Sequence, residues 1–280
     1  MKVELAKSAG FCYGVRRAVE VAQQTAASGR PCVMLGHIIH NNSVIESLEA
    51  QGVAVVDRPE DVPEGSAVII RSHGEGRAVH EALEARGVEI IDTTCPNVSR
   101  IHRLVSEAEA EGRTPLIIGA PSHPEIQAIA GWCREPVVLD GPEALEEWLK
   151  EDRARAQMPL AMVSQTTSTR ERWETCIKKV KKECTNIKIS DTICNATCKR
   201  QAEAQELAAR NEAMIVIGSR ESSNTRRLAE LCAALCPTVL WIERAEELEP
   251  SNLYGKASVG ITAGASTPGW IIKEVYDKMS

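Results

Sequence analysis

The chain has 280 residues, of which 43% are apolar, 26% are charged and 3% are aromatic, with a formal net charge of −6 at pH 7. This balance is typical of a folded globular protein and excludes disordered, collagen-like and coiled-coil chains. The acidic charge and the few aromatic rings argue against a nucleic-acid partner, which needs a basic excess and stacking platforms. No apolar run is long enough to span a membrane and the N-terminus lacks a signal-peptide core, so we expect a cytoplasmic protein without a membrane partner.

Six short apolar runs bounded by turn residues predict strands that are buried on both faces. The runs are 32–35, 68–70, 116–118, 137–139, 214–217 and 239–242. Between many of them apolar residues recur at helical spacing, as at Val98, Ile101 and Val105. Alternating buried strands and amphipathic helices predict an α/β fold with mainly parallel sheets.

Three segments of the chain repeat the order cysteine, helix, apolar strand, glycine. In each segment the glycine comes 24 residues after the cysteine, and the segments run from Cys12 to Gly36, Cys95 to Gly119 and Cys194 to Gly218. Identical spacings indicate an internal repeat, so we predict three pseudo-equivalent α/β lobes, a trefoil around a central site. The expected lobes are 12–94, 95–193 and 194–280. The N-terminal segment 1–11 is expected to complete the third lobe with a strand over residues 3–8.

The chain contains ten cysteines, which a cytoplasmic protein keeps reduced. Only Cys12, Cys95 and Cys194 share a position in the repeat, between a predicted strand and a predicted helix, where a thiolate is stabilised. Three thiolates can bind zinc or an iron–sulfur cluster and leave one metal position for a substrate, and the spacing does not distinguish the two. The others are expected to be small buried apolar residues. They are Cys32, Cys133, Cys176, Cys184, Cys198, Cys232 and Cys236.

A second cysteine pattern, C-x3-C occurring twice, is an alternative zinc site. Its members are Cys194, Cys198, Cys232 and Cys236. Leu231 and Leu235 border the second pair on a predicted helix, so packing in the core explains that pair better than metal binding.

Polar residues fall in register after the three glycines. Four residues past each glycine stand His40, His123 and Ser222, and two residues further stand Asn42, Glu125 and Asn224. These positions open a second helix in each repeat, where unpaired N–H groups attract an anion. A later turn in each lobe carries His73, Thr166 or Ser266. Local helix capping explains His40, His123 and the segment 222–224 when each is taken alone, and complementarity to the helix dipole explains Glu125. Together, however, a set of these polar residues predicts a ring of hydrogen-bond donors for phosphate or diphosphate beside the metal: Ser222, Ser223, Asn224, His40, His73 and Ser266.

The chain resembles the family of 4-hydroxy-3-methylbut-2-enyl diphosphate reductases along essentially its whole length. The motifs that carry the resemblance are GFC at 10–12, HN at 40–41, SHG at 72–74, TCP at 94–96, SHPE at 122–125, QTT at 165–167, ICNAT at 193–197, GSRESSN at 218–224 and TAGAST at 262–267. Each motif is weak alone, whereas the ordered set is highly specific.

The resemblance implies one 4Fe-4S cluster per chain, ligated by Cys12, Cys95 and Cys194, whose fourth iron is open and binds the alcohol oxygen of the substrate. It implies reductive dehydroxylation of the allylic diphosphate to isopentenyl and dimethylallyl diphosphate, the last step of the non-mevalonate isoprenoid pathway. Glu125, helped by Thr166, would relay protons, and a ferredoxin or flavodoxin would donate electrons. The residues implied to hold the diphosphate are His40, His73, His123, Ser222, Ser223, Asn224 and Ser266.

The chain departs from the pattern of the family in three segments. Around the first cysteine, Ala9 stands where many relatives have an arginine and Tyr13 where many have an alanine. Arg71 begins a turn that reads RSHG instead of SAHG, and Gly269 stands where relatives often carry an acidic residue. None of them is an implied ligand or proton donor. Two other functions stay open from the residues alone: an iron–sulfur sensor or cluster carrier that does not need Glu125, and a metal-free or zinc-containing phosphoester-binding enzyme.

Overall fold

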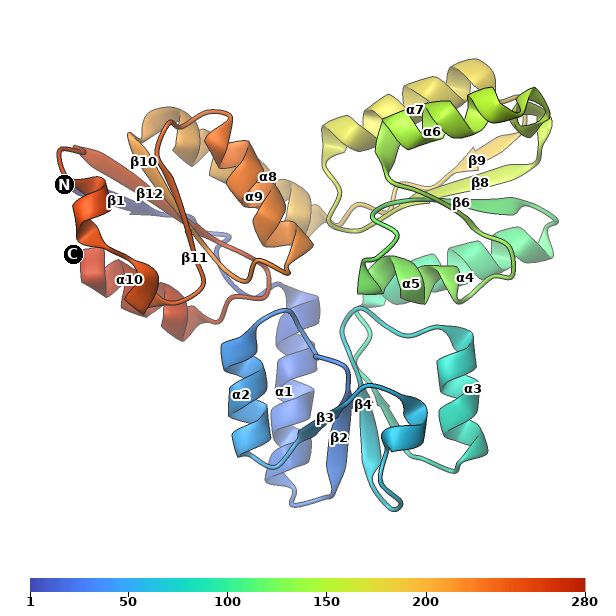
Figure 1. Ribbon diagram of the computed structural model, residues 1–280, viewed down its shortest axis with the longest axis horizontal. Coiled ribbons are helices and arrows are strands. Elements are labelled where there is room, and N and C mark those ends of the chain that lie inside the picture. The colour runs from blue at the N-terminus through green and yellow to red at the C-terminus, as the bar shows by residue number, and fades with distance from the viewer. Residues whose placement is uncertain (280) are drawn as a thin grey trace. The chain divides into compact units, whose positions relative to one another are not determined.

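A computed structural model describes residues 1–279, which form three four-stranded sheets that alternate with helices along the chain (Figure 1). The strands are β1 (Lys2–Leu5), β2 (Cys32–Leu35), β3 (Ala54–Val56), β4 (Ala67–Ile70), β5 (Ile90–Asp92), β6 (Thr114–Ile118), β7 (Val137–Leu139), β8 (Leu160–Ser164), β9 (Ile187–Ile189), β10 (Ala213–Ile217), β11 (Val239–Ile242) and β12 (Ser258–Ala263). The α-helices are α1 (Tyr13–Ala27), α2 (Asn42–Ala50), α3 (Arg77–Ala85), α4 (Pro96–Ala110), α5 (Pro124–Ala130), α6 (Gly141–Glu151), α7 (Arg170–Glu183), α8 (Asn195–Arg210), α9 (Ser223–Ala233) and α10 (Gly269–Met279). Four short 3-10 helices join them within the described residues: η1 (Pro59–Asp61), η2 (Arg153–Gln157), η3 (Ala245–Glu247) and η4 (Pro250–Leu253). The strand pairs in all three sheets are parallel, which confirms the predicted fold class.

The chain forms two compact units. Unit I comprises residues 1–17, 39–48 and 195 onward, and unit II comprises residues 18–38 and 49–194. Unit I contains one of the sheets and unit II contains the other two. The lobe boundaries expected from the repeat stay a prediction. No helix within residues 1–279 combines the length and the apolar character that crossing a bilayer requires.

The sheet of unit I has the strand order β1-β12-β10-β11. The N-terminal strand pairs with the last strand of the chain, Lys2 opposite Ser258, and it covers Lys2–Leu5 rather than the expected residues 3–8. Alternate residues of the sheet face opposite sides. Ile215 packs in a cluster with residues of α10, while Met214 packs in a second cluster with residues of α8 and α9.

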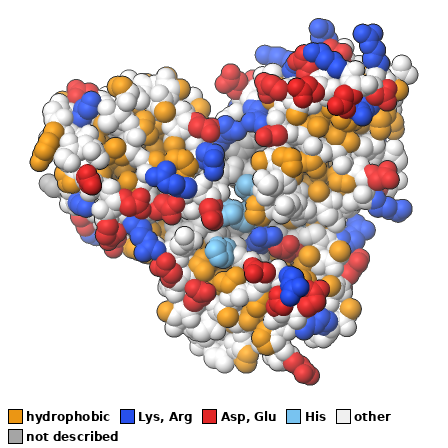
Figure 2. All heavy atoms as spheres, viewed as in Figure 1, with side chains coloured by type: hydrophobic (Ala, Val, Ile, Leu, Met, Phe, Trp, Pro, Cys, Tyr) orange, Lys and Arg blue, Asp and Glu red, His pale blue; other side chains and the backbone are white. Residues whose placement is uncertain are grey.

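One sheet of unit II has the strand order β7-β6-β8-β9. In Figure 1, α4 and α5 cover one of its faces and α6 and α7 cover the other. Ile101, Ile117 and Ile126 form a buried cluster that joins α4 and α5 to the sheet. Acidic and basic side chains alternate over α6 and α7 (Figure 2), where Glu146 pairs with both Lys150 and Lys179.

The remaining sheet has the strand order β3-β2-β4-β5 and packs against Leu83 of α3. All six predicted apolar runs are strands. However, β7 and most of β11 are only half-buried, not buried on both faces as expected. Both are the outermost strands of their sheets, where helices cover less of the surface.

Candidate active site

Each of the three repeat cysteines directly precedes a helix, as the spacing predicts. Cys12 precedes α1, Cys95 is the N-cap of α4 and Cys194 precedes α8. All three side chains are half-buried, and the ten cysteines of the chain form no disulfide. These thiols therefore lie at helix N-termini, at positions that a ligand can reach.

A backbone hydrogen bond ties each of these cysteines to a polar turn that lies in a different predicted lobe from the cysteine itself. The Cys12 N–H donates to Ala265 O at 3.2 Å, Cys95 N–H to Ser72 O at 3.0 Å and Cys194 N–H to Thr166 O at 3.0 Å. Ala265, Ser72 and Thr166 are therefore equivalent positions. The residues after them, Ser266, His73 and Thr167, share the next position. Thr166 therefore lies one residue before the position of His73 and Ser266, which refines the approximate register that the sequence allowed across insertions.

Most of the other cysteines have the buried, structural character that was expected. Burial raises the pKa of Cys133 and Cys176 to about 11 and that of Cys232 to about 12, so these thiols stay protonated. Cys232 and Cys236 pack in the apolar cluster beneath α8 and α9, which explains the second half of the alternative zinc pattern. Burial was expected for all seven of these cysteines, but three of them are only half-buried: Cys133, Cys184 and Cys198.

A buried carboxyl group lies at the N-terminus of α5 in unit II. Glu125 is only 3% exposed, and its two carboxylate oxygens accept hydrogen bonds from Thr166 N and Thr166 Oγ1, both at 2.6 Å. Desolvation raises the pKa of Glu125 and outweighs the two hydrogen bonds, which lower it. A carboxyl group of this kind holds its proton more readily than an exposed one, as a general acid requires.

Two histidines accompany Glu125 in unit II. His123 is the N-cap of α5, and its Nδ1 accepts the Glu125 N–H at 3.1 Å. The imidazole of His73, on the turn after β4, lies edge-on to that of His123, with ring centroids 5.6 Å apart. The structure therefore brings together four of the candidate site residues, His73, His123, Glu125 and Thr166.

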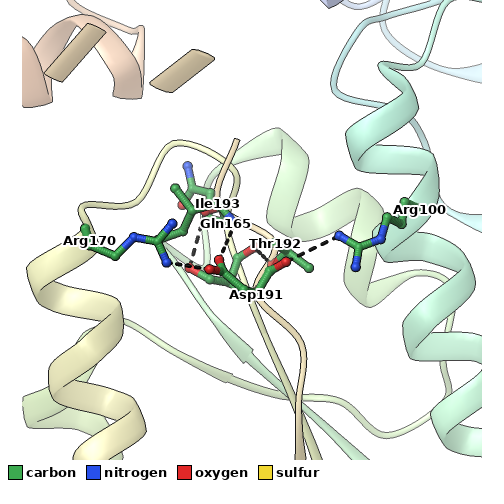
Figure 3. Close-up of polar contacts among 7 residues, drawn as sticks. Arg100, Gln165, Arg170, Asp191, Thr192 and Ile193 are labelled. Atoms are coloured by element: carbon green, nitrogen blue, oxygen red, sulfur yellow. Dashed lines mark hydrogen bonds and ion pairs between the residues drawn. The ribbon is translucent and has the colours of Figure 1, made fainter. Parts of the chain in front are cut away.

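Polar contacts brace the loop that delivers Cys194 (Figure 3). The Asp191 carboxylate pairs with Arg170, and the Asp191 carbonyl accepts a hydrogen bond from Arg100 at 3.3 Å. Thr192 Oγ1 donates to Ser164 O at 2.6 Å and accepts from Ser164 N at 2.8 Å. This bracing was missed in the sequence, because it joins residues that are far apart along the chain.

The sulfur of Cys194 lies beside the helix that Cys95 begins. Asn97 Nδ2, in the first turn of α4, donates to Cys194 Sγ at 3.3 Å. Within residues 1–279, no three His, Cys, Asp or Glu side chains are grouped as a metal site.

Unit I gathers the other predicted residues. Ser266 Oγ donates to His40 O at 3.0 Å, and His40 Nδ1 lies 3.9 Å from the carboxylate of Glu221. Ser222 follows Glu221 and caps α9 by accepting the Thr225 N–H at 3.3 Å. The residues brought together here are Cys12, His40, Ser222, Ser223, Asn224 and Ser266.

Asn224 and Arg200 are the notable buried polar residues of this group. Asn224 is 4% exposed, and neither Nδ2 nor Oδ1 of its amide has a hydrogen-bond partner within the described residues. A buried amide without partners at a helix N-terminus indicates a missing polar ligand. Arg200 of α8, which the sequence did not single out, donates to Gly10 O at 3.0 Å and to Ala263 O at 3.2 Å, so it holds the loops that carry Cys12 and Ser266.

Comparisons with known proteins match this chain to one family over essentially its whole length. A family model described as "LytB protein" matches residues 3–280. A Geobacter sulfurreducens protein named 4-hydroxy-3-methylbut-2-enyl diphosphate reductase is 41% identical over 285 residues, which cover 100% of this chain and 97% of that protein. A protein of the same name from Caldanaerobacter subterraneus subsp. tengcongensis is 39% identical over 284 residues, covering 100% of this chain and 96% of that protein.

Solved structures agree as well. One, described as (E)-4-hydroxy-3-methyl-but-2-enyl diphosphate reductase, "the Terminal Enzyme of the Non-Mevalonate Pathway", is 37% identical with a TM-score of 0.72, and the match covers 100% of this chain and 99% of that one. The E-1-hydroxy-2-methyl-but-2-enyl-4-diphosphate reductase from Plasmodium falciparum is 24% identical with a TM-score of 0.92, over 99% of this chain and 87% of that one. The second match shows a shared fold.

Proposed function

Because the chain belongs to the LytB protein family, we propose that it is a 4-hydroxy-3-methylbut-2-enyl diphosphate reductase acting at the end of the non-mevalonate pathway. In the proposed reaction the allylic C–O bond breaks, two electrons and two protons are taken up, and the hydroxyl leaves as water. Isopentenyl or dimethylallyl diphosphate is the product. The observation that carries the proposal is the buried Glu125 carboxyl, held by Thr166 beside two histidines.

One 4Fe-4S cluster per chain is the proposed cofactor, with Cys12, Cys95 and Cys194 as its ligands. The chemistry of the donors fits, because these three thiols are half-buried at helix starts and Asn97 donates a hydrogen bond to the sulfur of Cys194. When bound, the cluster supplies single electrons and a Lewis-acidic iron. The electrons come from an external carrier, for which a cytoplasmic ferredoxin or flavodoxin is the proposed partner.

Glu125 is the proposed source of the proton that leaves with the hydroxyl group. Its raised pKa keeps a proton available, and Thr166 orients the carboxyl through both N and Oγ1. His123 accepts the Glu125 N–H at Nδ1, so the neutral ring carries its proton on Nε2 and can donate it to a phosphate oxygen. Proton transfer and anion binding are thus assigned to neighbouring residues of α5.

The diphosphate is proposed to bind at helix N-termini, where N–H groups and hydroxyls converge. In unit II the donors are His73 and His123. In unit I they are His40, Ser222, Ser223, Asn224 and Ser266. The unpartnered amide of Asn224 supports this assignment, since an anion supplies the acceptor that its Nδ2 lacks.

The direct test is anaerobic purification followed by iron analysis and electronic spectroscopy with and without the hydroxylated diphosphate. We expect a brown protein whose spectrum changes when substrate is added and which reduces the substrate with a chemical one-electron donor. A colourless protein that takes up no iron during reconstitution would contradict the proposal.

Replacing Asn224 by leucine is expected to change anion affinity and stability in opposite directions. Affinity for inorganic diphosphate should fall about 10- to 100-fold, since a buried donor to the anion is lost. The free energy of unfolding of the ligand-free protein should rise by about 1–3 kcal/mol, because a buried amide without partners is removed. Calorimetric titration and denaturant unfolding measure the two effects.

Asn211→Leu is the matched control in the same unit. Asn211 is also buried, but its Nδ2 donates to Leu207 O within the fold at 3.0 Å. The control should leave diphosphate affinity unchanged. Equal losses of affinity in both variants would show that Asn224 does not contact the anion.

A further inference from the structure

In unit II, the turn that carries His73 and the helix that carries His123 meet at two glycines. Gly76 follows the turn, and Gly131 is the C-cap of α5. A Cβ atom on Gly131 would lie 2.7 Å from Gly76 Cα, and a Cβ on Gly76 would lie 3.1 Å from Gly131 Cα. The first distance is about 1 Å shorter than an ordinary carbon–carbon contact. Only glycine at Gly131 permits this approach of the two backbones.

Hydrogen bonds hold the two backbones in this position. Arg77 N–H donates to Gly131 O at 3.1 Å, and Trp132 Nε1 donates to Glu75 O at 2.9 Å. Glu75 in turn pairs with Arg71 at 2.7 Å across the turn that contains His73. Arg71, a departure from the family pattern, therefore stabilises the turn through its ion pair with Glu75.

The ring of Trp132 is held by residues of α4 and α3. It stacks on the buried imidazole of His102, with ring centroids 5.2 Å apart and an interplanar angle of 18°. The guanidinium of Arg77 also lies over the Trp132 ring, 5.5 Å from its centroid. Ser106 Oγ donates to Trp132 O at 2.9 Å. We call Arg77, His102, Ser106 and Trp132 the Trp132 cluster.

His102 of the Trp132 cluster also packs against the turn that carries His73. Gly74 has a φ of +78°, and a Cβ there would lie 2.6 Å from His102 Cε1. The backbone beside His73 therefore rests on the ring on which Trp132 stacks. Through α5, which has only seven residues, Trp132 and Gly131 are linked to His123 and Glu125 at the other end of the helix.

We propose that the Gly76–Gly131 contact and the Trp132 cluster are positioning elements that set the separation of His73 from His123 and Glu125. This inference rests on the proposed function, because it explains how two of the proposed diphosphate donors and the proton donor are held in register. None of these residues is among the proposed cluster ligands, proton donors or diphosphate donors. They act by fixing two backbone segments that belong to different sheets of unit II.

Gly131→Ala tests the contact without straining the backbone. Gly131 has φ −67° and ψ −4°, values that alanine adopts readily, so the added methyl group acts only by pushing Gly76 away. In crystal structures of the holoenzyme, we expect the distance between the His73 and His123 rings to increase. Affinity for inorganic diphosphate should fall about tenfold, and kcat/KM should fall about 10- to 100-fold, since displacements near 1 Å have effects of this size.

Gly269→Ala is the matched control, because a Cβ at Gly269 meets no atom within 4 Å. It should keep the ring separation, diphosphate affinity, KM and kcat of the wild type. Trp132→Phe, which keeps the ring but removes the hydrogen bond to Glu75 O, should raise KM more than it lowers kcat. If these glycines serve stability alone, Gly131→Ala should lower the unfolding temperature, while the folded enzyme keeps the wild-type separation of the His73 and His123 rings and the wild-type KM. This result would overturn the inference. If the ring separation changes in Gly131→Ala but the wild type reduces no substrate, the positioning inference stands and the proposed function fails.

Discussion

Glu125→Gln is expected to lower turnover about 10²- to 10⁴-fold, the usual contribution of a general acid. Glutamine has the shape of glutamate, and its amide can keep both contacts with Thr166, so the local fold should persist. Glutamine cannot release a proton to the departing hydroxyl, so the chemical step should slow while KM changes little. Steady-state assays under anaerobic conditions measure both constants.

Glu109→Gln serves as the control for this substitution. Glu109 lies on α4, where its carboxylate accepts the Arg134 N–H at 2.7 Å. The control should keep wild-type turnover. An active Glu125→Gln enzyme would contradict the proton-donor role and favour a cluster carrier or sensor.

Glu125→Gln should also make the protein more stable, and the gain in the free energy of unfolding should depend on pH. Burial raises the pKa of Glu125 in the folded state, so the folded protein holds this proton at pH values where the unfolded chain has lost it. The wild type therefore loses stability as pH rises above the unfolded pKa of about 4.3, and Glu125→Gln does not. The difference in unfolding free energy should grow from pH 5 upward. A difference that shrinks as pH rises would contradict the raised pKa.

Cys95→Ser and Cys194→Ser are each expected to abolish the cluster and the activity. A site with three protein ligands has none to spare, and a serine hydroxyl is a harder, more basic ligand than a thiolate. After anaerobic reconstitution, iron should fall from about four atoms per chain to below about one, and turnover should fall more than about 10³-fold. Iron analysis, visible absorption and far-ultraviolet circular dichroism separate loss of the cluster from loss of the fold.

Cys133→Ser is the matched control. Cys133 is half-buried in unit II, and its Sγ lies 3.6 Å from Ala130 O, which a serine hydroxyl can also reach. Burial raises the pKa of Cys133 to about 11, so its thiol is a poor ligand. The control should keep iron, colour and turnover. A Cys95→Ser protein that keeps all three would show that the ligands have been wrongly assigned.

The order of elements and the placement of the cysteines could be predicted because their signals are local. An apolar run, a helical period or a capping residue acts within a few residues of itself, so His123 and Ser222 are N-caps where the repeat placed them. The six apolar runs are strands for the same reason. Their burial was predicted less well, since β7 and most of β11 are only half-buried because of their place at the edge of a sheet.

By itself, the sequence determined the α/β fold, the three cysteines at helix starts and the polar residues that open the second helices. Only the tertiary structure decided the details that depend on packing between distant segments. These include the pairing of Glu125 with Thr166, 41 residues away, the register that aligns Thr167 with His73, and the contact of Gly76 with Gly131. Capping and periodicity act over a single turn or strand, whereas these contacts form only when whole sheets and helices come together, so no local pattern of residues specifies them.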